Sequence, residues 1–119
     1  MASDWQEVTT SFKDPSTGAA FTGYLLATMA VDKVLLANGG YLSAYRYKFA
    51  VTAGQAYMAD GVTELILPIT EDANPVNAPI FLSLMDTHGR ITPYGYVVIP
   101  RPASTDPYPA VDLDDHLTV

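Results

Sequence analysis

Hydrophobic and polar residues alternate with a period of two along several stretches of the chain. The clearest stretch is 41–51, where the odd positions are mostly aromatic and the even positions include Arg46 and Lys48. A period of two places successive side chains on opposite faces of a strand. We therefore predict a strand over 41–51 that covers a core with its aromatic face.

Residues 63–70 repeat the pattern, with Leu65, Leu67 and Ile69 on one face. Pro68 has no backbone N–H to donate, which predicts that this strand lies at a sheet edge or ends nearby. Strands are also expected over 5–13 and 20–28, separated by the turn-forming residues 14–18.

Two further apolar runs, 78–85 and 94–100, are joined by the short polar segment 86–90. This arrangement predicts a β-hairpin, with Gly89 at positive φ in the turn.

The segment 25–38 fits two structures. Some of its apolar residues lie at helical spacing, and Asn38-Gly39 could cap a helix. Equally, residues 34–36 could form a short strand that a turn at 38–40 joins to the strand at Tyr41. We favour the strand because β patterning dominates on both sides.

Six or seven short strands separated by turns describe an all-β sandwich domain over residues 1–100. From Pro100 the character changes, because four prolines fall within ten residues and a cluster of aspartates follows. Proline at this density favours extended chain. We therefore expect an extended, acidic, Pro-rich C-terminal arm over 101–119. If this arm is ordered, we expect a neighbouring subunit or partner to hold it, because few apolar residues anchor it.

Only 16% of the 119 residues are charged, against about 25% in soluble proteins. Low charge and abundant tyrosine are typical of protein interfaces. A net charge of −7 with six scattered cations argues against nucleic-acid and anionic-membrane partners. No apolar run reaches the length of about 18 residues that spans a bilayer, and the N-terminal residues do not resemble a secretory signal.

Candidate chemistry is sparse. The absence of cysteine excludes disulfides, thiol nucleophiles and Cys-ligated metals. His88 and His116 have no second ligand or nucleophile at a suitable spacing, so we interpret both as surface residues. The acidic segment 71–74 and the C-terminal aspartates lack the ligand spacing of a calcium loop. We predict no catalytic residue, no metal and no cofactor.

The tyrosines divide into two groups. Packing against the sheet is favoured for Tyr45 and Tyr47, whereas Tyr57, Tyr94 and Tyr108 could equally pack or contact a partner. The candidate partner-binding residues are Tyr94, Arg101, Tyr108, Asp112, Asp114 and Asp115.

Two turn motifs carry a family resemblance. The first is Asp14-Pro15-Ser16-Thr17-Gly18 with the Thr-Gly strand start at residues 22–23, and the second is Leu67-Pro68-Ile69-Thr70-Glu71-Asp72. With the hairpin that follows, their order over roughly residues 8–100 resembles β-sandwich modules of minor tail and tail-fibre proteins of tailed bacteriophages.

The resemblance implies an immunoglobulin-like or transthyretin-like sandwich and a non-enzymatic structural protein located in the virion. Such a protein would dock on a tail, baseplate or capsid lattice, with other virion proteins and copies of itself as partners. The alternative is a small carbohydrate-binding or adhesion module that contacts host-surface glycans through its loop tyrosines.

Overall fold

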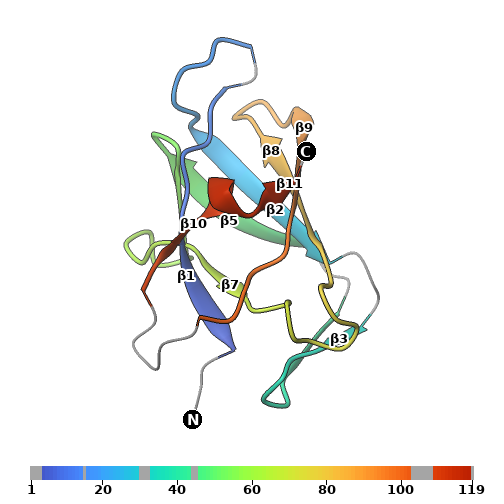
Figure 1. Cartoon of the computed structure of the whole chain (residues 1–119). Coiled ribbons are helices and arrows are strands. Elements are labelled where there is room, and N and C mark those ends of the chain that lie inside the picture. The colour runs from blue at the N-terminus through green and yellow to red at the C-terminus, as the bar shows by residue number, and fades with distance from the viewer. Residues whose placement is uncertain (1–3, 15, 30–32, 44–45, 103–108, 119) are drawn as a thin grey trace.

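The computed structural model describes residues 4–14, 16–29, 33–43, 46–102 and 109–118, and in these the regular structure is almost entirely β (Figure 1). The elements are β1 (Trp5–Thr9), β2 (Gly23–Met29), β3 (Lys33–Leu35), β4 (Tyr41–Ser43), β5 (Arg46–Thr52), β6 (Gln55–Tyr57), β7 (Ile66–Pro68), β8 (Ile80–Met85), β9 (Ile91–Val97), β10 (Val111–Asp112), the single-turn 3-10 helix η1 (Leu113–Asp115) and β11 (Leu117–Thr118). The all-β prediction is confirmed. Among the described residues, no helix has the length and apolar character needed to cross a membrane.

The described strands form two main sheets and a separate two-stranded sheet. The larger sheet has the order β11-β9-β8-β2-β5-β6, the smaller has the order β10-β1-β7, and β3 pairs with β4. Apolar side chains from both main sheets, such as Leu25, Leu82 and Leu67, are buried in one shared core. This arrangement is consistent with the expected sandwich.

Local patterns predicted several elements correctly. Leu65, Leu67 and Ile69 are all buried, and β7 lies at the edge of its sheet, as Pro68 indicated. The predicted hairpin is β8 and β9, paired from Ile80–Val97 to Met85–Ile91. In its turn, Gly89 has a φ of +86°.

The Thr-Gly strand start of the first turn motif has a steric cause. Gly23 opens β2, where an added Cβ would lie 2.5 Å from the carbonyl oxygen of Met85 and 2.7 Å from the ring of Phe21. A larger residue would therefore separate β2 from β8 at their first paired position.

The strand predicted over 41–51 is wrong as a single element. Residues 41–43 form β4, which pairs with β3, whereas β5 pairs with β2 in the larger sheet. Residues 44–45, and with them Tyr45, lie outside the described residues. The end of β2 at Met29 and the hairpin of β3 and β4, turned at 38–40, confirm the extended interpretation for 25–29 and 33–38, the described parts of that segment.

The C-terminal segment, defined as residues 109–118, packs on the same chain. β10 runs parallel to β1 with Val8 opposite Val111, and β11 runs antiparallel to β9 with Leu117 opposite Val97. Between them, Leu113 is fully buried. Figure 1 shows this red segment crossing from β1 to β9.

This packing differs from the extended arm expected from the sequence. The density of prolines predicted an extended arm. Val111, Leu113 and Leu117 nevertheless pack against the core of the same chain. Residues 103–108, which connect the domain to the C-terminal segment, lie outside the described residues.

Candidate functional site

The predicted partner-binding residues fall in two places. Tyr94 and the three aspartates, Asp112, Asp114 and Asp115, lie at or near the C-terminal segment. Arg101 lies elsewhere, beside residues 71–72. Tyr108 is outside the described residues, so nothing in the structure bears on it.

The Tyr94 ring packs inside the chain. It meets Phe12 edge to face, with ring centroids 4.9 Å apart. Burial raises the pKa of the Tyr94 hydroxyl, and the negative charge of Asp114 raises it further. The Tyr94 ring therefore packs against the core, and its contact with a partner stays a prediction.

The aspartates form a small acidic group around η1. The Asp112 carboxylate accepts a hydrogen bond from the Asp114 N–H at 3.1 Å and so caps the helix. Partial burial raises the pKa of Asp114, and the charges of Asp112 and Asp115 add to that effect. Contact between these aspartates and a partner stays a prediction.

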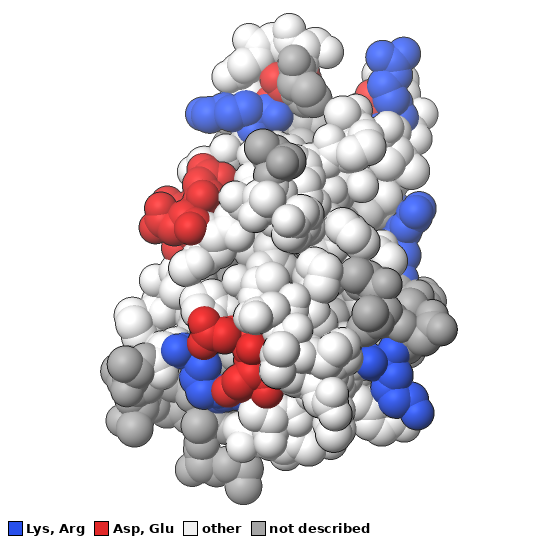
Figure 2. Space-filling view, turned by 45° about the vertical axis from the view of Figure 1, so that its right-hand side comes forward, with Lys and Arg blue, Asp and Glu red and all other residues white. Residues whose placement is uncertain are grey.

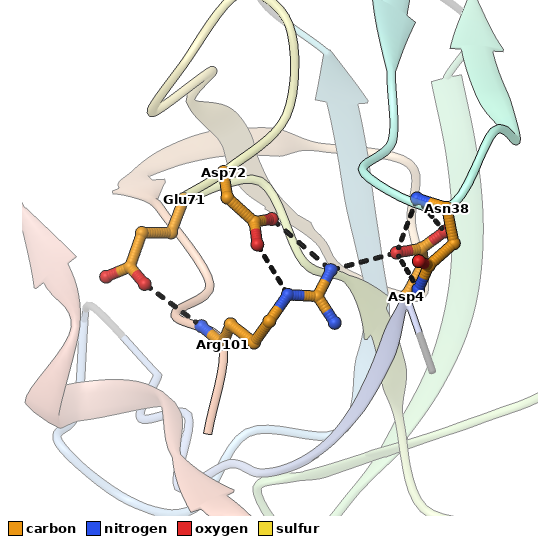
Figure 3. Close-up of polar contacts among 5 residues, drawn as sticks. All are labelled: Asp4, Asn38, Glu71, Asp72 and Arg101. Atoms are coloured by element: carbon orange, nitrogen blue, oxygen red, sulfur yellow. Dashed lines mark hydrogen bonds and ion pairs between the residues drawn. The ribbon is translucent and has the colours of Figure 1, made fainter. Parts of the chain in front are cut away.

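Arg101 cross-links three segments of the chain (Figure 3). Its guanidinium lies 2.9 Å from the carboxylate of Asp4 and also pairs with Asp72. Asp4 is nearly buried and additionally accepts hydrogen bonds from the backbone and side chain of Asn38, each at 3.1 Å. The start of β1, the β3–β4 turn and the loop after β7 are thereby held together.

The same cross-link accounts for the acidic segment 71–74. The Glu71 carboxylate accepts a hydrogen bond from the Arg101 N–H at 3.3 Å, while Asp72 pairs with the guanidinium. Within the described part of the chain, no group of three or more histidine, aspartate or glutamate side chains is arranged to hold a metal ion.

Three adjacent strands of the larger sheet carry no charged residue on its outer face, and the Lys48 ammonium of the neighbouring strand β5 lies over the Tyr24 ring of β2. β2, β8 and β9 contain no Asp, Glu, Lys, Arg or His. On their outer face Phe81 is 49% exposed and Tyr96 37% exposed, and the two rings pack edge to face with centroids 6.0 Å apart. Figure 2 shows one side of the molecule, on which charged side chains occur in small, separate groups.

An apolar cleft opens between the two main sheets and has a volume of about 270 Å³. Its lining is formed by Trp5, Ala27, Met29, Leu42, Tyr47, Phe49, Met58, Ile66, Leu67, Pro68 and Ile80. Trp5 is 46% exposed and Tyr47 36% exposed, whereas the other lining residues are buried or half-buried.

The cleft lies between two strands, β5 and β7, at the point where β5 is no longer paired with β6. β6 pairs only with Ala50–Thr52, so the Arg46–Phe49 part of β5 extends beyond it. Opposite, β7 pairs with β1, and the Ile66 N–H donates to the Met58 sulfur at 3.4 Å. Among the described residues, no strand lies between these two edges.

Sequence reasoning missed most of the cleft. It placed the Tyr47 side chain on the core face of its strand, which agrees with the lining of the cleft. Trp5 and Met58 were not singled out, because nothing in their local patterns indicates that the sheets part beside them.

Comparisons with family models, curated proteins and solved structures gave no match to this chain.

Proposed function

We propose that this chain is a non-enzymatic structural protein of a tailed-phage virion, which docks on a tail, baseplate or capsid lattice. The observation that carries the proposal is the uncharged outer face of β2, β8 and β9 with Phe81 and Tyr96 exposed on it. Protein interfaces are depleted of charge and enriched in aromatic residues. Contiguous exposed apolar patches commonly mark interaction sites.

Support for the virion comes from the two turn motifs. The Gly18 N–H donates to the Asp14 carbonyl at 2.8 Å, and the Ala73 N–H donates to the Thr70 carbonyl at 3.3 Å. Both motifs are therefore turns, as they are in the phage modules that they resemble. The finer fold that we propose is an immunoglobulin-like or transthyretin-like sandwich.

The C-terminal region has a part in this proposal. Asp112, Asp114 and Asp115 are exposed on a segment whose apolar side chains face the core. We propose that this acidic surface contacts other virion proteins or copies of the chain, while the apolar side keeps the segment on its own domain.

Mass spectrometry of purified particles tests the role. We expect the chain in fixed copy number, and expect the double variant Phe81→Asp with Tyr96→Asp to fold but to be lost from particles. Val62→Asp is the matched control, because Val62 is 80% exposed and lies in the loop between β6 and β7, outside β2, β8 and β9. Full incorporation of the double variant would contradict docking through this face.

A glycan array distinguishes the alternative function, a carbohydrate-binding or adhesion module, from the structural role. Clear binding of a host-surface glycan by the purified chain, together with its absence from particles, would favour the carbohydrate-binding module over the structural protein.

A further inference from the structure

We propose that the apolar cleft accepts one extended segment of another protein, in which apolar side chains pointing into the cleft alternate with acidic side chains pointing outward. The inference rests on the proposed assembly role and names the kind of partner segment that the domain would receive. Four features of the cleft support it.

The first feature is the backbone at its two edges. Beyond the end of β6, Arg46 and Lys48 belong to a part of β5 that, in the described chain, is paired with β2 alone. Across the cleft, the Ile66 N–H has a thioether as its acceptor, which is weaker than a carbonyl. Unpaired strand edges are templates for an added strand, as in complexes formed by β-augmentation.

The second feature is the size and chemistry of the interior. Its volume of about 270 Å³ lies below the roughly 300–1,000 Å³ of sites that enclose drug-sized ligands. The lining side chains, such as Met29, Phe49 and Ile80, are apolar. A space of this kind suits one or two apolar side chains anchored by a backbone outside it better than a whole small molecule.

The third feature is the positive charge on the outward face of β5, opposite the face that lines the cleft. Arg46 and Lys48 alternate with Tyr47 and Phe49, so they project outward while the aromatic residues face the cleft. Lys48 is held with its Nζ 4.1 Å from the centroid of the Tyr24 ring. Cross-strand neighbours on one face interact directly, so a strand added beside β5 gains from acidic residues at its outward positions.

The fourth feature is a precedent within this fold. Val111, Asp112, Leu113 and Asp114 show the same alternation of apolar and acidic residues in sequence, with Val111–Asp112 extended as β10 and Leu113–Asp115 turned into the helix η1. That segment already bridges the two main sheets on the other side of the domain, with Leu113 buried and both aspartates exposed. The sheets therefore accept such a segment between their edges.

Peptide binding to the full chain tests the inference. The probes are a synthetic peptide of alternating aspartate and leucine and a matched peptide of alternating lysine and leucine, measured by calorimetry and amide hydrogen exchange. We expect the aspartate peptide to bind at least tenfold more tightly and to slow exchange at the amides of Lys48 and Ile66.

Charge reversal supplies the matched variants. Arg46→Glu with Lys48→Glu changes two exposed residues and should reverse the preference between the peptides. Lys13→Glu with Arg90→Glu makes the same change in net charge away from the cleft and should leave the preference intact. Reversal by this control pair would show a response to net charge alone and would overturn the inference.

Two other results would also overturn it: equal affinity for both peptides, or binding that leaves exchange at Lys48 and Ile66 unchanged. Neither result would contradict the proposed structural role, because the composition of purified particles tests that role separately. A chain present in particles that binds neither peptide would retain the proposed function and lose the strand-acceptor site.

Discussion

The two lateral sides of the domain, where the main sheets approach each other, differ in how far they are closed. On one side the C-terminal segment connects β1 to β9 and buries Leu113. On the other side, Leu65 connects the sheets through hydrogen bonds with Ala56 and Val8. Beyond this connection the apolar cleft opens between the sheets.

This difference shows what closure requires. A short segment with alternating apolar and exposed acidic residues is enough to seal one side, although each of its strands has only two residues. Where no such segment is present among the described residues, apolar side chains remain accessible. Closure therefore depends on which segment reaches the edge, and four substitutions distinguish the two sides.

Leu113→Ala should have the largest effect, because it removes the buried anchor of the closed side. We expect the free energy of unfolding to fall by about 3 kcal/mol, as for other buried leucines. Urea unfolding measures it. Val76→Ala, at an exposed site, should change stability by less than about 0.5 kcal/mol. A similar small change for Leu113→Ala would mean that this side is not closed by the segment.

Arg101→Ala should loosen the open side, because Arg101 joins Asp4 at the start of β1 to Asp72 after β7. The nearly buried Asp4 carboxylate would lose a charged partner, and we expect a loss of about 2 kcal/mol in thermal or urea unfolding. Asp72→Ala should cost less than about 1 kcal/mol, since Asp72 is exposed. Equal losses would show that burial of Asp4 does not matter.

Ala27→Leu should fill part of the cleft. The added atoms enter existing space, so we expect stability to rise by up to about 1 kcal/mol and binding of the aspartate peptide to weaken. Ala56→Leu is the matched control, because Ala56 is fully buried in the core and does not line the cleft; it should lower stability by more than about 1 kcal/mol. Equal destabilisation by both variants would contradict an open cleft.

Asp114→Asn should have the smallest effect, at the acidic surface of the closed side. The pKa of Asp114 is raised in the folded chain, so the unfolded chain loses this proton first and stability falls as pH rises from about 3.8 through the raised value. The variant should therefore melt slightly higher than the parent at neutral pH, and this advantage should disappear below about pH 3.8. Melting temperatures across this pH range measure it.

Asp60→Asn provides a control of opposite sign. Hydrogen bonds from the Thr63 side chain and from the backbone of Val62 and Thr63 lower the pKa of Asp60. Its charged form is therefore favoured by folding at neutral pH, and the substitution should lower the melting temperature there. A rise for both variants would indicate a general response to net charge.

Local signals account for what the sequence predicted. The hairpin at 86–90 and the turn at 14–18 depend on neighbouring residues, and both are present. The alternation at 63–70 correctly predicted which side chains are buried, but only Ile66–Pro68 of that stretch forms a strand. The division of 41–51 into β4 and β5 was not predicted, because a continuous alternation does not indicate that two parts pair with different sheets.

The C-terminal pairing, the apolar cleft and the Arg101 cross-link were harder to predict, because each joins residues that are far apart in the sequence. The partner of Val111 is Val8, and nothing near either residue specifies the other. The cleft is harder still, since Trp5, Met58 and Ile66 come from separate segments and meet where strand pairing ends. Arg101 was singled out as charged, but its acceptors Asp4 and Asp72 could not be named from spacing.

The parallel pairing of β10 with β1 has a consequence for synthesis of the protein. The Gln6 side chain donates to the carbonyl of Pro109 across 103 positions of sequence, so this side cannot close until residues 109–118 have left the ribosome. Until then, β1 and β9 each present an edge that the C-terminal segment later occupies. Contacts between such distant residues form slowly, and exposed edges in nascent chains promote aggregation. A ribosome that stalls before residue 109 would therefore hold a chain open on both sides, which is a substrate for chaperones.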